Sequence, residues 1–184
     1  VYYPGTAPVP EGVAVNVRGR SYKILANVEI EDPDAEGVIF AHGSRFGGHA
    51  LFIKDRKLNY VYNFLGIKPE QVFTSDVELE PGSYTLGMDF EKTDTGEFGE
   101  SFGTTTLYID DKAVASGDMR TQPGKFTLSG DGLCIGYDSG DAVSELYQTP
   151  GEFEGGTIQK VGVSVSGEPY ENLELEAKRM MKRQ

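Results

Sequence analysis

The sequence has no tryptophan, one cysteine and two histidines among its 184 residues. A single cysteine cannot form an intramolecular disulfide, so the fold does not depend on an oxidising compartment. Cys134 lies in the short apolar segment 133–137, which is typical of a strand, and we expect its thiol to be a small core group. Two histidines with one distant cysteine also lack the ligand spacing of a zinc site.

Motifs that carry common chemistry are scarce as well. One Gly-x-Ser-x-Gly match occurs, at residues 99–103, but no strand–turn–helix pattern surrounds it, and no Gly-rich loop ends in Gly-Lys-Ser/Thr. Glycoside hydrolases need two carboxylates facing each other across a sugar. The pairs Glu29/Glu31 and Glu78/Glu80 have a suitable strand spacing, but we interpret both as solvent-facing. We therefore predict that this segment is not an enzyme, and a free-standing hydrolase is the least favoured alternative.

Positive charge is scarce, with 17 Lys and Arg against 29 Asp and Glu, for a formal net charge of −12. Such a charge repels polyanions, so we expect no nucleic acid, anionic membrane or heavily sulfated glycan as a partner. No signal peptide or membrane-spanning run is visible. The compartment stays undetermined, with the bacterial cytoplasm as the preferred expectation. Since the sequence begins at Val1 rather than Met, we expect it to be part of a longer protein.

Period-two alternation dominates the middle of the sequence. Apolar side chains alternate with polar ones from Tyr22 to Ile30, as in a strand with one buried face. Turn signals occur at 55–57, Pro81-Gly82 and Asp110-Asp111. Further strands are expected at 38–41, 51–53, 58–64, 84–90, 104–110, 112–116, 126–128, 133–137 and 158–165. About ten short strands with turns between them predict an all-β sandwich or barrel.

The two ends of the sequence differ from this pattern. Residues 1–20 contain three prolines and predict an extended lead-in segment, which leaves 21–168 for the β-sandwich. In residues 169–184, Leu173, Ala177 and Met180 fall at helical spacing, with acidic residues early and basic residues late. We predict a short C-terminal helix that packs on the sandwich or on a neighbouring domain.

A glycine-rich segment, 43–48, lies between His42 and His49. It could present Arg45 and Phe46 to a ligand or a partner domain, so these four residues are candidates for an interaction loop. The alternative is a flexible connection between strands with solvent-exposed histidines.

Aspartates and glycines gather in residues 130–141, which include Asp131, Asp138 and Asp141. Calcium takes six to eight oxygen ligands, and loops of this composition can supply them. The three aspartates are therefore candidate calcium ligands. Turn chemistry explains the same composition equally well, and the spacing is not that of an EF-hand.

The segments 37–43, 50–55, 57–63 and 106–111 together resemble the laminin G-like pattern. This resemblance implies a laminin-G/concanavalin A-like jelly-roll β-sandwich. A closer similarity is to the C-terminal region of bacterial arylsulfatases, carried by residues 3–5, 45–51, 60–63, 120–124, 136–140 and 153–158.

The sulfatase resemblance implies a non-catalytic accessory domain. Sulfatases share a Cys/Ser-x-Pro-x-Arg motif, whose first residue becomes formylglycine beside a calcium ion. Cys134 is followed by Ile-Gly-Tyr-Asp, without the proline or the arginine. The resemblance thus implies that calcium and formylglycine belong to an upstream catalytic domain, which would be the partner of this segment, and that the segment itself holds no cofactor. The alternative is a carbohydrate-binding module with a glycan ligand.

Overall fold

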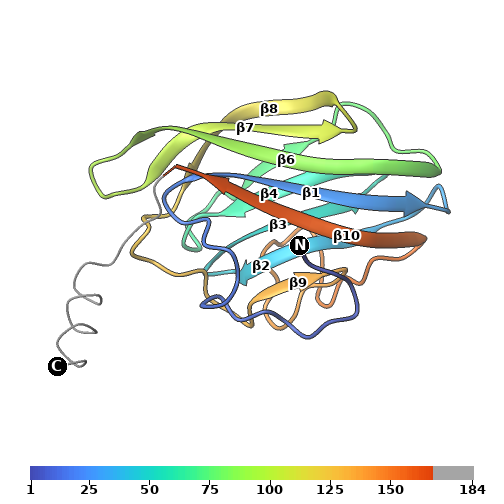
Figure 1. The fold of residues 1–184 in the computed structure, drawn as a ribbon, viewed down its shortest axis with the longest axis horizontal. Helices are drawn as coiled ribbons and strands as arrows, with labels where there is room; N and C mark the ends of the chain where they lie inside the picture. Colours follow the sequence, from blue (N-terminus) through green and yellow to red (C-terminus); the bar gives the residue numbers. More distant parts are fainter. Residues whose placement is uncertain (168–184) are drawn as a thin grey trace.

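The computed structural model describes residues 1–167, which form two five-stranded antiparallel sheets packed face to face (Figure 1). The first sheet has the strand order β10 (Gly156–Ser166), β1 (Ser21–Ile30), β6 (Gly82–Thr95), β7 (Ser101–Ile109), β8 (Lys112–Thr121). The second has the order β5 (Gln71–Thr74), β4 (Lys57–Asn63), β3 (Gly47–Lys54), β2 (Gly37–Ser44), β9 (Leu133–Ile135). The predicted all-β sandwich is confirmed.

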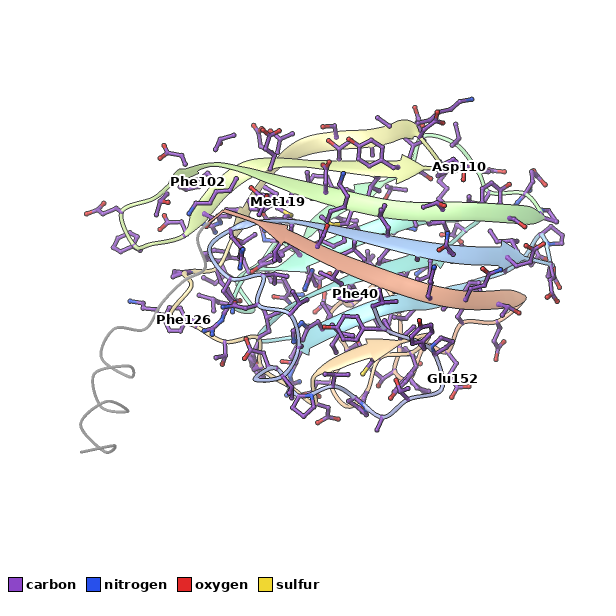
Figure 2. The ribbon with its side chains drawn as sticks, viewed as in Figure 1. Phe40, Phe102, Asp110, Met119, Phe126 and Glu152 are labelled. Atoms are coloured by element: carbon purple, nitrogen blue, oxygen red, sulfur yellow. The ribbon has the colours of Figure 1, made fainter. Side chains whose placement is uncertain are left out.

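The core lies between the sheets and follows the predicted alternation. In β1 every second side chain from Tyr22 to Ile30 is buried, while Lys23 and Leu25 are exposed on the outer face. Phe40 lies between the sheets, whereas Phe102 and Phe126 are exposed toward one end of the sandwich (Figure 2). Burial of each large apolar side chain contributes roughly 1.5–3 kcal/mol, which makes this core the main source of stability. Cys134 is buried, as expected.

Local turn chemistry sets the tight hairpins. Asp55 and Arg56 have φ values of 52° and 60°, so β3 and β4 are joined by a two-residue turn of the primed type. Asp110 and Asp111 also join β7 to β8 by a two-residue turn, in which Asp110 has φ of 55°. Pro81 precedes β6, which begins at Gly82. The two predicted hairpin turns are confirmed, whereas Pro81 lies at a bend that leads into β6.

The structure differs from the sequence predictions at two places, and a third prediction lies outside the described residues. β5 was not predicted, and residues 126–128 do not form a strand. Residues 126–128 do not form a strand because Gln122 Nε2 donates to the carbonyls of Phe126 and Thr127, in place of the backbone partners that a neighbouring strand would provide. The predicted helix at 169–184 lies outside the described residues. Nothing in residues 1–167 forms a helix long and apolar enough to cross a membrane.

The two long sides of the sandwich are each closed by a cross-sheet link. On one side, the segment 1–20 makes isolated bridges from Tyr2 to Val161 of β10 and from Val9 to Leu133 of β9. It therefore ties the edge strands of the two sheets together (Figure 1). On the other side, the Gln71 side chain donates to the Arg120 carbonyl and accepts from its amide, both at 2.8 Å.

The outer face of the second sheet carries its own apolar cluster. Side chains that point away from the main core pack beneath residues 143–147, and they comprise Val38, Ala41, Ala50, Phe52 and Val61 together with Val143, Leu146 and Tyr147. The segment after β9 thus forms a covering layer over this sheet. That layer positions one wall of the site described next.

Candidate functional site

A groove of about 840 Å³ lies where the tip of the β2–β3 hairpin meets the covering segment after β9. Its walls come from three stretches that are distant in sequence: the hairpin tip, the connection between β4 and β5, and residues 141–149. The groove brings together two features that the sequence singled out separately, namely the glycine-rich segment with Arg45 and Phe46, and the Asp/Gly-rich segment with Asp141.

The hairpin tip is a tight turn rather than the flexible loop considered above. β2 continues to Ser44 and β3 begins at Gly47, so only Arg45 and Phe46 form the turn. Gly43 has φ of 103°, and a Cβ there would lie 2.3 Å from the Gly47 carbonyl oxygen. Glycine is therefore required by close backbone approach, and it brings the strands together beneath two projecting side chains.

Arg45 and Phe46 are both accessible at this tip. Phe46 is 59% exposed as a residue, and the Arg45 guanidinium lies 4.7 Å from the centroid of its ring, within cation–π distance. Arg45 Nε also lies 3.5 Å from Asp141 Oδ2. An exposed aromatic ring thus stands beside a charged donor and a charged acceptor.

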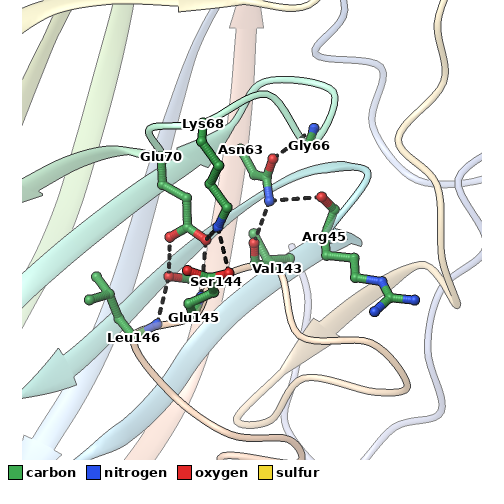
Figure 3. A network of polar contacts seen from close by, with 9 residues as sticks. All are labelled: Arg45, Asn63, Gly66, Lys68, Glu70, Val143, Ser144, Glu145 and Leu146. Carbon is green, nitrogen blue, oxygen red and sulfur yellow. Dashed lines mark hydrogen bonds and ion pairs between the residues drawn. The ribbon is translucent and has the colours of Figure 1, made fainter.

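Asn63 holds the three walls in place from below. Its Nδ2 donates to the carbonyls of Arg45 (3.0 Å) and Val143 (2.9 Å), and its Oδ1 accepts from the Gly66 amide (2.9 Å) (Figure 3). The side chain is buried, with 3% of the residue exposed. One amide therefore satisfies backbone groups from all three stretches and fixes their relative positions.

Glu70 anchors the covering segment in a second place. Its carboxylate accepts from Ser144 Oγ at 2.6 Å and from the Glu145 amide at 3.0 Å (Figure 3). Lys68 Nζ lies 2.8 Å from Glu145 Oε1 and 3.4 Å from Glu70 Oε1. The Glu70 side chain is 9% exposed, whereas those of Lys68 and Glu145 are mostly in solvent. Charge-assisted bonds to a nearly buried carboxylate are the stronger kind.

The three candidate calcium ligands have separate partners. Asp138 is buried and accepts from the Val143 amide and from the Tyr147 hydroxyl at 2.6 Å. Burial raises the pKa of Asp138, and these two hydrogen bonds oppose the shift. Asp131 accepts from Ser139, and Asp141 faces Arg45. Within residues 1–167, no group of three or more His, Cys, Asp or Glu side chains is placed to hold a metal ion.

His42 and His49 lie inside the sandwich, apart from Arg45 and Phe46. They are 2% and 0% exposed, and His49 Nδ1 lies 2.9 Å from the Tyr60 hydroxyl, which in turn contacts the Tyr22 hydroxyl at 2.7 Å. Burial lowers the pKa of His42 to about 4. Burial and, secondarily, the neighbouring His42 lower the pKa of His49 well below its usual range. The four interaction-loop candidates therefore divide into a core pair and an exposed pair.

The paired glutamates considered for hydrolysis lie away from this groove. Glu78 and Glu80 both pair with Arg56, and their side chains are more than half exposed. Sequence reasoning did not single out Asn63, Lys68 or Glu70, which shape the groove. No local pattern marks them, because their partners lie on segments distant in sequence.

Comparisons with known proteins identify the fold. No protein-family model matches the sequence, and no curated protein matches it. The carbohydrate-binding module CBM40 of the Ruminococcus gnavus IT-sialidase, solved bound to α2,3-sialyllactose, is similar with a TM-score of 0.59 and 11% identity, over 97% of this chain and 93% of that one. Domains LG4-5 of the mouse laminin α1 chain are similar with a TM-score of 0.57 and 13% identity, over 90% of this chain and 41% of that one.

These two similarities identify the fold of this chain but not the family to which it belongs. This chain spans less than half of the laminin fragment that it matches. Neither structure is a sulfatase, so the sulfatase resemblance of the sequence gains no support from them. Together with the 5+5 antiparallel strand order, they show that the chain has the concanavalin A-like, laminin G-like β-sandwich fold.

Proposed function

We propose that this domain binds a glycan in the groove between the β2–β3 hairpin tip and residues 141–149. The observation that carries the proposal is the exposed Phe46 ring beside the Arg45–Asp141 pair. Sugar hydroxyls both donate and accept, so they fit a site that offers a guanidinium and a carboxylate side by side. The apolar face of a sugar ring packs on an aromatic side chain.

The support beneath the groove favours binding. Asn63 and Glu70 hold the walls through hydrogen bonds to backbone groups, so the polar side chains project from a fixed frame. A preformed site avoids the entropic cost of ordering loops when the ligand arrives. The resulting groove is concave and combines an apolar ring with a few convergent polar groups, as small-ligand sites commonly do.

The similarity to CBM40 agrees with this proposal. That module was solved with a bound oligosaccharide and shares the fold over nearly the whole of both chains. Fold similarity at 11% identity supports a class of ligand by analogy, while the site itself has to be argued from its own residues.

The test is a glycan array followed by calorimetric titration of the best ligand. We expect Phe46→Ala and Arg45→Ala each to weaken binding by about tenfold or more, as truncation of a contact residue worth ~1.4 kcal/mol would. Phe98→Ala is the matched control, because Phe98 is 73% exposed but lies on the β6–β7 connection outside the groove. Binding that survives Phe46→Ala and Arg45→Ala unchanged, or an array without ligands, would refute the proposal.

The sequence resemblance supports a second proposal about the parent protein. According to this second proposal, the segment is a non-catalytic accessory domain of an arylsulfatase, and an upstream catalytic domain carries the formylglycine and the calcium. It is supported by the short segments along the chain that resemble the C-terminal region of bacterial arylsulfatases, together with the missing Cys/Ser-x-Pro-x-Arg motif. Sequencing the gene upstream of the Val1 codon tests it, and a reading frame without that motif would exclude it.

A further inference from the structure

We infer that the groove selects uncharged glycans and discriminates against sialylated ones. The inference rests on the proposed function and specifies its ligand class. It runs against the ligand seen in the structurally similar CBM40 module, which was solved with α2,3-sialyllactose. The charged side chains that line the groove are its basis.

The described residues lining the groove include two cations, Arg45 and Lys68, and three carboxylates, Glu70, Asp141 and Glu145. Their formal sum is 2 − 3 = −1. Each cation already faces a carboxylate: Arg45 lies 3.5 Å from Asp141, and Lys68 lies 2.8 Å from Glu145 and 3.4 Å from Glu70. An incoming sialic acid carboxylate would therefore compete with an existing anion for either cation.

Repulsion adds to this competition. Asp141 and Glu145 are more than half exposed at the groove surface, so a ligand carboxylate placed near Arg45 or Lys68 also approaches a like charge. The net charge of −12 extends the unfavourable potential beyond the groove. Like-charge juxtaposition is a common means of rejecting a wrong ligand.

A neutral sugar fits the same arrangement without this penalty. Neighbouring hydroxyls of one sugar can donate to Asp141 and accept from Arg45, so the ion pair does not have to be broken. The uncharged side chains of Gln148 and Thr149 line the groove as well and offer further donors and acceptors. The ring of Phe46 supplies a stacking surface next to the pair.

The experiment compares matched oligosaccharides that differ only in a terminal sialic acid, lactose and α2,3-sialyllactose among them, on the whole chain by array and calorimetry. We expect each neutral member that binds to bind at least about tenfold more tightly than its sialylated partner at low salt. Raising the salt concentration should narrow this difference, because added ions screen the repulsion.

A charge variant provides an independent measurement. Asp141→Asn combined with Glu145→Gln changes the groove sum from −1 to +1 and should raise affinity for the sialylated member by about tenfold relative to the neutral one. Asp118→Asn, at an exposed position of β8 outside the groove, is the matched control and should leave the ratio unchanged. Equal or tighter binding of sialylated ligands by the unmodified chain would overturn the inference yet keep the glycan proposal, whereas no binding to any glycan removes both.

Discussion

His42 and His49 show how a single residue's environment departs from its local sequence. Next to a glycine-rich segment, both were candidates for an exposed loop, yet both rings lie between the sheets. The physical reason is that β2 extends to Ser44, so the alternation that buries Phe40 continues to His42. His49 is the partner of His42 across the strand pair and is buried with it.

The buried histidines should make the fold sensitive to acid. The folded-state pKa of His42 is about 4, below the 6.5 of an exposed histidine, so between these pH values the unfolded chain binds more protons. Stability is thus full above about pH 6.5 and falls as the pH decreases toward 4. Because of this pKa shift, His42 alone lowers the free energy of unfolding by about 2 kcal/mol between pH 7.5 and pH 5. Urea titrations of His42→Phe should therefore show a smaller decrease in the free energy of unfolding over the same pH range.

The comparison of the variant with the unmodified chain isolates the effect of His42, which includes its secondary lowering of the pKa of His49. Asp89 and Asp138 have pKa values raised first by burial, so they act in the opposite direction, but they are present in both proteins. An unchanged pH dependence in His42→Phe would show that His42 is not held neutral in the folded state.

At the scale of elements, the hairpin tip beneath the groove depends on close packing of glycine backbones. We expect Gly43→Ala to destabilise the domain by about 2 kcal/mol or more, since its Cβ would meet the Gly47 carbonyl and its φ disfavours other residues. Gly12→Ala is the control: no atom lies within 4 Å of the added Cβ, so stability should change by less than about 0.5 kcal/mol. Equal midpoints in chemical denaturation would contradict the tight turn.

The covering segment over the second sheet should depend on Glu70 in the same way. Glu70→Ala leaves Ser144 and the Glu145 amide without their acceptor, and we expect a loss of about 1–3 kcal/mol. Glu145→Ala removes only an exposed ion pair and should cost less than about 0.5 kcal/mol. Hydrogen exchange in residues 141–149 should rise in Glu70→Ala alone. Equal exchange in both variants would show that Glu70 is not the anchor.

At the scale of the whole molecule, two links close the long sides of the sandwich. One is the segment 1–20, with bridges to β10 and β9, and the other is the paired contact of Gln71 with Arg120. Open sheet edges promote association between chains, so these links protect the domain as well as stabilise it.

Removal of residues 1–10 should therefore lower the thermal midpoint and promote aggregation, because it exposes the edges of β9 and β10. Tyr3→Ala serves as the control, since Tyr3 is 56% exposed, whereas Tyr2 forms a bridge to Val161. Calorimetry and light scattering provide the measurements. A shortened chain that stays monomeric with an unchanged midpoint would show that the segment does not seal the edges.

The sequence by itself determined the all-β class, the buried face of β1 and the two tight hairpin turns. These depend on side-chain alternation and backbone preference, which act over a few residues. Only the tertiary structure decided that Arg45 faces Asp141, that Asn63 and Glu70 hold the groove, and that both histidines are core groups. Those outcomes depend on which strands are neighbours and which segment covers the second sheet. Such contacts join residues that are distant in sequence, so no local sequence pattern indicates them.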